Sequence, residues 1–462
     1  MRKQNKVAFF NILSTILLRG ISLFTAPLFS RMLGTDGYGI VSIYTIWVGV
    51  AAIAFTLQTN GTLVNARVEY PEEQQHKYQS SVMTLSLLFF LLCSAVTVVF
   101  LPQVSALLKL HWGVILLMLL HSFGSFCLNF LNSKFTYEFK ADKNMYVSVG
   151  ITLTTIILSV LLILLMPEDL KHYGRILALS LTYGCLGIGI CSYVLIKGRT
   201  FYNREYWTLA LTLALPVVFY SLSDLLLGQC DRVMLQWMMN ESMVGQYSLA
   251  FNFGGIMFTI FVALNNSWTP FYFEDMKQKR QERMQRQAGN FLELFTVLSI
   301  GFILLAPEVY HIFASRDFWA GISLIPIFVS SYYLNFLCTF PINYDYFYKK
   351  TKVVAVVTVA TSLMNLGLNY LLIQSMGVTG AALATALSHG MQLAAHYIYV
   401  RYMLKKGDYP FGIRLWAKYA AAYLGIVALV YVTPNGGILR WALGGAIGLW
   451  ELYRIKKRKV LI

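Results

Sequence analysis

The sequence predicts an all-α polytopic membrane protein of about fourteen transmembrane helices, arranged as two six-helix lobes followed by two C-terminal helices. Three observations lead to this fold class. Of the 462 residues, 57% are hydrophobic and 13% are charged, whereas soluble domains average about 25% charged residues. The hydrophobic residues occur in runs of about 20, the length that crosses a bilayer as a helix. The two halves also share a repeated pattern. A soluble globule is excluded, because burying this many hydrophobic residues in one water-exposed core would exceed the size at which single cores stop growing, about 250–300 residues.

Fourteen apolar runs can be interpreted as spans. The first follows a short basic segment, as in a signal peptide, but it continues past Ala26 without a small-residue cleavage site, so we expect it to be retained. The fourteen centres lie near Leu18, Val50, Leu91, Phe123, Ile157, Gly187, Phe219, Met257, Ile300, Tyr332, Leu363, Gly390, Leu424 and Leu443.

The positions of Lys and Arg indicate the orientation of these spans. Cytoplasmic loops carry an excess of the two residues, and here every odd-numbered connecting segment has more of them than either neighbour. A missed span would reverse this order further along the chain, and no such reversal occurs. We therefore predict a multi-pass membrane protein of fourteen spans with both termini cytoplasmic. The net charge of +16 lies in these loops, which favours the lipid bilayer as a partner and excludes nucleic acid.

An internal repeat supports the two lobes. Segment 32–42 lies over segment 238–248, so that Gly39 falls on Gly245 and Ser42 on Ser248. Six spans separate the copies, so both halves insert in the same orientation, which is the parallel type of transporter repeat. The predicted domains are an N-terminal six-helix lobe at 1–205, a C-terminal six-helix lobe at 206–405, and two extra helices with a basic tail at 406–462.

Several spans carry polar residues on one helical face. Hydrogen bonding between helices is one explanation, and a water-filled cavity between the lobes, in which the residues bind substrate, is the other. The first span has Asn11, Thr15 and Arg19, spaced so that they share one face. The other candidates are Tyr220 in the seventh span, Asn129 and Asn335 in spans four and ten, and Asn60 and Asn266 at the ends of spans two and eight.

Two charges lie deep within predicted spans. Arg19 lies in the middle of the first span, where a charge costs at least ~2.5 kcal/mol, so a functional role is expected. Asp224 is identified as the only acid well inside a span, and we expect it to couple transport to an ion or to form a structural ion pair. The two residues lie at similar depths and could meet. No metal site is expected. No Walker loop, His-Glu-x-x-His or Gly-x-Ser-x-Gly motif occurs, which argues against ATP-driven transport and hydrolysis.

Three segments resemble one family of transporters. Segment 27–39, PLFSRMLGTDGYG, is similar to the first-loop signature of bacterial Wzx-type polysaccharide flippases, which belong to the multidrug/oligosaccharidyl-lipid/polysaccharide exporter superfamily. Asp231 and Arg232 with segment 245–248 resemble its second-half counterpart, in which Asn240 replaces the usual glycine and predicts a less tight loop. Asn365 to Asn369 with segment 377–385 resemble the segment of spans eleven and twelve.

This resemblance implies a secondary transporter of the bacterial cytoplasmic (inner) membrane and not an enzyme. It implies translocation of an undecaprenyl-diphosphate-linked oligosaccharide by alternating access, for O-antigen or capsule synthesis, and suggests contact with the polysaccharide polymerase machinery. No cofactor is implied, and the coupling ion would be H⁺ or Na⁺. Arg19 suits a diphosphate, because a guanidinium can donate two hydrogen bonds to it at once. Arg31, Asp36, Asp231 and Arg232 would be gate or loop charges.

Three alternatives remain open at this stage. The first is a flippase for another lipid-linked precursor, such as that of peptidoglycan. A drug/cation antiporter of the same superfamily is the second, although such proteins typically have twelve spans and more acids in the cavity. The third is a membrane polymerase or ligase, which would typically have a long outer loop, and here the largest outer loop, 307–320, is short.

Overall fold

The computed structural model describes residues 3–404, 409–433 and 437–458. The described residues form helices joined by short connections, and no strand occurs among them. This architecture suits the apolar composition, because in lipid a backbone amide finds a hydrogen-bond partner only within a helix or a closed barrel.

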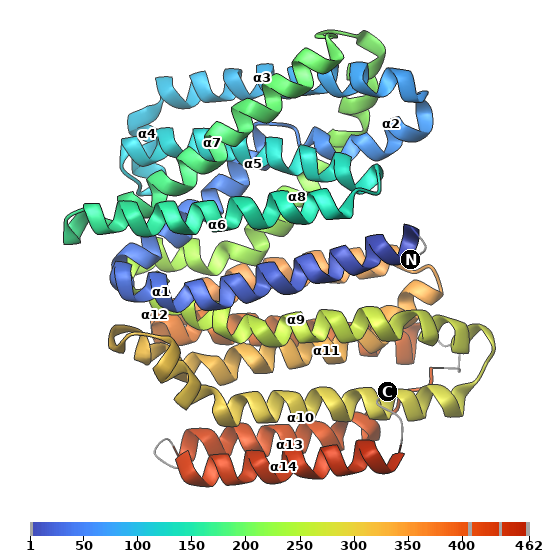
Figure 1. Cartoon of the computed structure of the whole chain (residues 1–462). Coiled ribbons are helices and arrows are strands. Elements are labelled where there is room, and N and C mark those ends of the chain that lie inside the picture. Colours follow the sequence, from blue (N-terminus) through green and yellow to red (C-terminus); the bar gives the residue numbers. More distant parts are fainter. Residues whose placement is uncertain (1–2, 405–408, 434–436, 459–462) are drawn as a thin grey trace. The chain divides into compact units, whose positions relative to one another are not determined.

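The chain divides into two compact units, Met1–Cys230 and Asp231–Ile462, and the boundary falls inside helix α8. The three domains expected from the sequence stay a prediction. The first unit contains α1 (Lys3–Ala54), α2 (Leu63–Glu69), α3 (Glu72–Val99), α4 (Leu101–Leu108), α5 (Trp112–Tyr137), α6 (Ala141–Leu165), α7 (Lys171–Gly198) and most of α8 (Arg204–Met238) (Figure 1). The second contains α9 (Glu241–Lys277), α10 (Gln281–Phe313), α11 (Ile325–Phe347), α12 (Thr351–Ile398), α13 (Ile413–Val432) and α14 (Gly437–Arg458).

Ten helices in the described part of the chain are long and apolar enough to cross a membrane. Two of them, in α1 and from α12 onward, reach 46 and 53 residues, or about 70 and 80 Å at ~1.5 Å per residue. That is more than twice the ~30 Å of a hydrocarbon core. Each is interrupted by a glycine of left-handed backbone, Gly34 (φ 66°) and Gly377 (φ 59°), a conformation that glycine adopts without steric cost. Each glycine therefore separates two arms that can cross the membrane in turn.

Counting both arms of α1 and α12, and adding α13 and α14, the described helices provide one segment for each of the fourteen predicted centres. The last two are less typical spans: α13 has a shorter apolar stretch, Trp416–Val432, and α14 is not among the ten apolar helices. The predicted fold class, an all-α polytopic membrane protein of about fourteen helices, is confirmed.

The two copies of the repeat turn in different ways. Gly34 bends the continuous helix α1 in the first copy, whereas Asn240 separates α8 from α9 in the second. The Asn240 backbone is extended, and its side-chain oxygen accepts a hydrogen bond from the Met243 N–H at 3.0 Å. Asn240 is therefore an N-cap, which satisfies an amide that the first turn of α9 leaves free.

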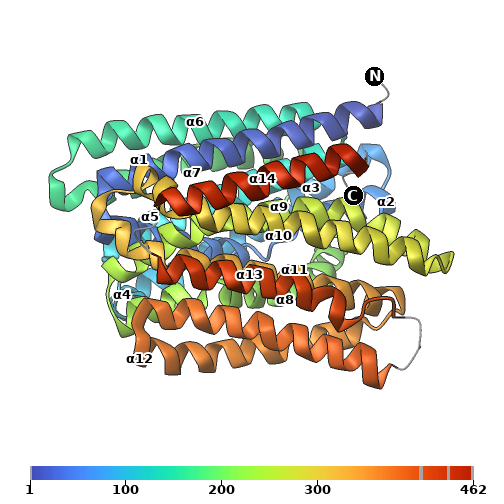
Figure 2. The ribbon, with the colours of Figure 1, turned by 90° about the horizontal axis from the view of Figure 1, so that it is seen from below.

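Ion pairs attach the last helix to α10. Both α13 and α14 pack on α10, and Figure 2 shows these helices from below. The Arg440 guanidinium of α14 contacts the Glu308 carboxylate of α10, and Arg454 of α14 contacts Glu293 of α10. The prediction that Asp224 is the only acid well inside a span is wrong, because Glu293 lies well inside α10 and is buried. Its pairing with Arg454 offsets the cost of placing a carboxylate there.

Glycines allow α5 and α7 to approach closely in the first unit. A Cβ atom added at Gly124 would lie 2.1 Å from the Tyr183 carbonyl oxygen, and one added at Gly187 would lie 2.5 Å from the Gly124 Cα. Small residues at such crossings let membrane helices gain close van der Waals contact. The crossing at Gly124 therefore fixes the distance between α5 and α7.

We expect Gly124→Ala to separate α5 from α7 and to destabilise the protein by about 1–3 kcal/mol, as overpacking commonly does. The measurement is the midpoint of thermal unfolding of purified protein in detergent. Gly150→Ala in α6 is the matched control, because nothing lies within 4 Å of a Cβ atom at that position. Equal midpoints for the two variants would show that the α5–α7 crossing is not tight.

Candidate functional site

An exposed polar face runs along the first arm of α1. Asn11, Thr15 and Arg19 are all exposed on it, and the Thr15 hydroxyl donates to the Asn11 carbonyl oxygen at 2.9 Å. An arginine exposed to hydrocarbon would be costly, so the surroundings of Arg19 must contain water, polar groups or an anion. The face can therefore contact a solute that carries hydroxyl and phosphate groups.

Helix α8 exposes a second polar face in the same unit. Tyr220 is 71% exposed, and Asp224 is exposed one turn further on. The next residue, Leu225, lies 3.1 Å from a Cβ atom added at Gly49, so α8 approaches the second arm of α1 here. In the part of the chain that the structure describes, no ion pair within 4.0 Å joins Arg19 to Asp224. Their pairing stays a prediction.

The remaining predicted substrate residues divide into exposed and hydrogen-bonded groups. Asn129 and Asn266 are exposed. Asn60 is half-buried and donates to the Ser133 hydroxyl at 3.4 Å. Asn335 is half-buried, and its amide nitrogen lies 3.5 Å from the His389 Nε2. The exposed residues can meet a solute, whereas the hydrogen-bonded ones also join helices within their own unit.

Two of the predicted gate charges flank the bend in α1. Arg31 and Asp36 are exposed on either side of Gly34. Gly34 has left-handed backbone angles. A change of angle at this residue would therefore change the separation of the two arms that carry Arg31 and Asp36.

Asp231 lies at the centre of a buried network in the second unit. Its carboxylate accepts hydrogen bonds from the Tyr247 hydroxyl at 2.5 Å, the Asn369 amide at 3.1 Å and the Thr385 hydroxyl at 3.0 Å. These donors come from α9 and from both arms of α12. A buried carboxylate is stable only when hydrogen bonds replace its water, and three donors provide that replacement.

The network continues along α12. Asn369 also donates to the Asn365 side-chain oxygen at 3.0 Å, and Asn365 donates to the Ser388 hydroxyl at 3.1 Å. Two of the three segments that resemble the flippase family are thus in contact. Sequence reasoning identified both segments without predicting that they meet; Asn365 and Asn369, one helical turn apart, were the available signal.

Arg232, the neighbour of Asp231, has a different environment. Its guanidinium lies 4.6 Å from the centre of the Phe251 ring, an arrangement in which the ring face attracts the cation. The adjacent residues thus divide their roles, since the acid joins α8 to α9 and α12 while the arginine packs on an aromatic ring of α9.

The first unit has a buried polar group of its own, which sequence reasoning missed. The Tyr44 hydroxyl lies 3.0 Å from the His121 Nδ1 and 2.8 Å from the Ser180 hydroxyl. Arg175 donates to the Ser159 hydroxyl at 2.5 Å, and its guanidinium lies 3.9 Å from the Phe29 ring centre. The signal was Ser159, a polar residue within the apolar run of α6. These contacts join α1, α5, α6 and α7.

The arrangement supports two kinds of function. The exposed faces of α1 and α8 can bind a polar solute, and the buried groups hold the helices of each unit in place. No group of three or more His, Cys, Asp or Glu side chains that could hold a metal occurs among the described residues.

Comparison with known proteins identifies the family. The model of a family described as polysaccharide biosynthesis protein matches residues 5–277, which is more than half of the chain. The chain belongs to this family. The family predicted from the first-loop and second-half signatures is confirmed. Two relatives from Haemophilus influenzae also match: an uncharacterized membrane protein is 23% identical over 357 residues, covering 74% of this chain and 83% of the relative, and Lsg locus putative protein 1 is 22% identical, covering 73% and 83%.

Solved structures show the same fold. The lipid II flippase MurJ in an inward closed conformation has a TM-score of 0.74 at 15% identity, covering 98% of this chain and all of that one. An inward-facing multidrug resistance MATE family transporter of the MOP superfamily has a TM-score of 0.57 at 13% identity, covering 87% and 95%. The chain therefore has the fold of flippases and multidrug transporters.

We expect Asp231→Ala to destabilise the second unit, because it leaves the Tyr247, Asn369 and Thr385 donors without their acceptor. An unsatisfied buried polar group costs about 1–3 kcal/mol. Thermal unfolding in detergent measures the change, with Asp36→Ala, at an exposed acid of α1, as the control. If Asp231→Ala unfolds at the same temperature as Asp36→Ala, the network does not hold α8 to α9 and α12.

Proposed function

We propose that this protein is a flippase that moves an undecaprenyl-diphosphate-linked oligosaccharide from the cytoplasmic to the outer leaflet of the cytoplasmic membrane. It acts by alternating access, has both termini in the cytoplasm, and supplies surface polysaccharide synthesis, in contact with the polymerase machinery. Membership of the polysaccharide biosynthesis family supports the pathway. The observation that carries the proposal is the exposed arginine, Arg19, within the apolar helix α1.

The chemistry of the exposed faces fits such a substrate. A diphosphate needs a cation that remains charged, and a guanidinium stays charged and donates hydrogen bonds in pairs. The oligosaccharide needs amide, hydroxyl and aromatic groups, which Asn11, Thr15 and Tyr220 present. The apolar lipid tail can stay in the bilayer, so the protein has to accommodate only the polar part.

Asp224 is the proposed coupling group. It is an exposed acid in a helix that is otherwise largely apolar. In the proposal, Asp224 neutralises Arg19 when no substrate is bound, and the diphosphate then displaces it. The freed carboxylate binds H⁺ or Na⁺, which favours the other conformation, because a bound ion stabilises the state that binds it more tightly.

The alternatives differ in substrate. The lipid II flippase shares the fold over the whole chain, which keeps a peptidoglycan precursor as the second candidate. The multidrug transporter shares it at a lower TM-score. A polymerase or ligase is disfavoured by the transporter fold. Purified protein in proteoliposomes, supplied in turn with undecaprenyl-diphosphate oligosaccharide and with lipid II, separates the first two candidates.

We expect Arg19→Ala to slow flipping of undecaprenyl-diphosphate oligosaccharide in proteoliposomes by about tenfold to a hundredfold. This range corresponds to about 1.5–3 kcal/mol for lost charged hydrogen bonds. Arg19→Lys should restore only part of the rate, because an ammonium cannot donate the paired hydrogen bonds of a guanidinium. The measurement is protection of the labelled glycan from a membrane-impermeant reagent.

The matched control is Lys418→Ala, since Lys418 is also an exposed cation in an apolar helix, α13. It should flip the substrate at the normal rate. A normal rate for Arg19→Ala, with equal protein content in the vesicles, would remove Arg19 from the substrate site.

We expect Asp224→Asn to retain glycan binding and to lose the response of flipping to an imposed H⁺ or Na⁺ gradient, because the amide cannot take up either ion as the carboxylate does. Initial rates with and without each gradient provide the measurement. A structural ion pair instead predicts that the variant protein fails to accumulate. Flipping that is both undiminished and still gradient-dependent would exclude a coupling role.

A further inference from the structure

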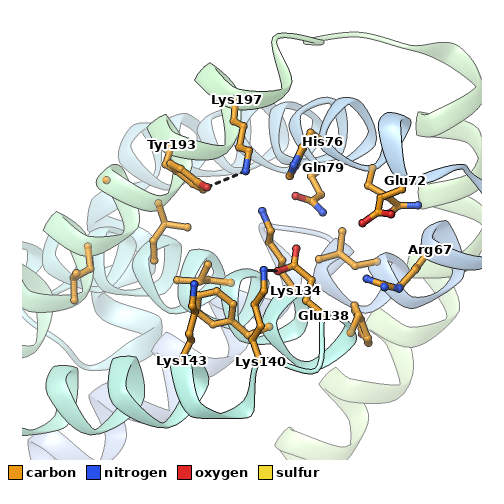
Figure 3. Close-up of a pocket in the computed structure, with 18 of the residues that line it drawn as sticks. Arg67, Glu72, His76, Gln79, Lys134, Glu138, Lys140, Lys143, Tyr193 and Lys197 are labelled. Carbon is orange, nitrogen blue, oxygen red and sulfur yellow. Dashed lines mark hydrogen bonds and ion pairs between the residues drawn. The ribbon is translucent and has the colours of Figure 1, made fainter. Parts of the chain in front are cut away.

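A separate cavity of about 910 Å³ lies within the first unit. It is formed by α2, by the beginnings of α3 and α6 and by the ends of α5 and α7 (Figure 3). The distribution of Lys and Arg predicts that these helix ends face the cytoplasm. None of the residues proposed above to bind the flipped substrate lines it.

The lining of this cavity is strongly basic. Its cations, all among the described residues, are Arg67, Lys134, Lys140, Lys143 and Lys197. The lining acids are fewer, Glu72 and Glu138, and Glu138 is already paired with Lys140, at 2.6 Å between the carboxylate oxygen and Nζ. The cavity therefore carries an excess of positive charge that its own acids do not neutralise.

Lys134 is the most unusual member of the group. The residue is 6% exposed, and lysine is almost never fully buried unless it is paired. Within the described residues, its ammonium forms no ion pair within 4.0 Å. It lies 5.6 Å from the centre of the Tyr193 ring, and Lys197 Nζ lies 5.6 Å from the same ring centre. Lys197 also donates to the Tyr193 hydroxyl at 3.3 Å. Both ammonium groups thus lie beside one tyrosine, and an anion bound near both would offset the repulsion between their like charges.

Hydrogen-bond donors accompany these charges. Figure 3 shows Lys134, Lys197, His76 and Gln79 pointing into a common space from α5, α7 and α3. Several donors that converge from different helices match the several acceptor oxygens of a phosphate group. Leu131, Leu186 and Ile190 add an apolar wall to the same cavity.

The second unit shows that the repeat does not require such a cavity. Lys350 precedes α12 as Lys140 precedes α6, but the neighbouring end of α11 is closed. There Asp345 and His396 are both fully buried and paired at 2.7 Å. Tyr409 packs against Tyr344, with ring centres 5.0 Å apart. The fold thus fills this position in one unit and leaves it open and basic in the other.

We propose that the cavity binds an anion that carries one or two phosphate groups, at a site distinct from that of the flipped substrate. A soluble phosphorylated compound and the headgroup of an anionic phospholipid share this chemistry. In either case the phosphate lies between Lys134 and Lys197, and the other lining cations attract it. The inference does not depend on which lipid-linked glycan the protein transports.

The first experiment measures pyrophosphate binding to the purified full-length protein in detergent by calorimetry at fixed ionic strength. Lys134→Gln and Lys197→Gln should each weaken binding about tenfold or more, because each removes a charged hydrogen bond. Lys352→Gln, at an exposed lysine of α12 in the other unit, is the control and should bind normally. Lys197 is exposed, so Lys197→Gln should fold and can decide the question by itself.

The second experiment separates the two ligand sources. The same proteins are placed in nanodiscs of phosphatidylcholine alone or with phosphatidylglycerol, and thermal unfolding is measured. Pyrophosphate binding that is lost in the two variants indicates a soluble ligand. Stabilisation by phosphatidylglycerol that is lost in the same variants indicates a lipid headgroup. The proposal is overturned if neither probe acts on the wild type, or if Lys352→Gln reduces either effect as much as the cavity variants do.

Discussion

The constraint on which this structure depends is that a bilayer offers no hydrogen bonds. The backbone meets it by forming helices throughout the described chain. Each polar side chain must meet it separately, either through a partner in the protein or by contact with water or a polar ligand. Both solutions occur among the polar groups of the transmembrane helices. Asp231, Glu293 and Arg175 have protein partners, whereas Arg19, Asp224 and Tyr220 are exposed.

This division relates position to function. The paired groups connect separate helices, and they hold the helices of each unit together. The exposed groups have unsatisfied hydrogen-bonding capacity, which a glycan, a diphosphate or an ion can use. The proposed function requires both kinds, because a flippase has to exchange solutes at its polar site while its helices stay packed.

The helices were more predictable from sequence than the contacts. Span positions follow from local hydrophobicity, so they can be derived from neighbouring residues. The contacts of Asp231 with Asn369 and Thr385 join distant segments, and a pattern along the chain does not contain them. Glu293 was overlooked for a related reason: its partner Arg454 lies in the final helix, so nothing near Glu293 in the sequence indicates that its charge is compensated.

The same reasoning applies to the predicted site. The polar face of α1 was accessible to prediction, because helical periodicity alone places Asn11, Thr15 and Arg19 together. The basic cavity was not, because its five cations come from three separate stretches of the chain, around Arg67, from Lys134 to Lys143 and around Lys197, and each stretch taken alone resembles an ordinary basic cytoplasmic loop. Only the packing of α5 on α7 shows that Lys134 and Lys197 lie near the same ring, that of Tyr193.

The bend at Gly34 means that a small change of backbone angle there displaces distant residues of α1 over a long path. Within this helix the non-helical backbone angles occur at one residue, Gly34, which separates the two arms. Arg19 lies about 22 Å from Gly34 along the helix, at ~1.5 Å per residue. A change of about 20° at the glycine would therefore carry the guanidinium through about 8 Å, the scale of hinge motions. A small change of angle at Gly34 is thus sufficient to displace the charge of Arg19 by several ångströms while the backbone hydrogen bonds within each arm stay in place.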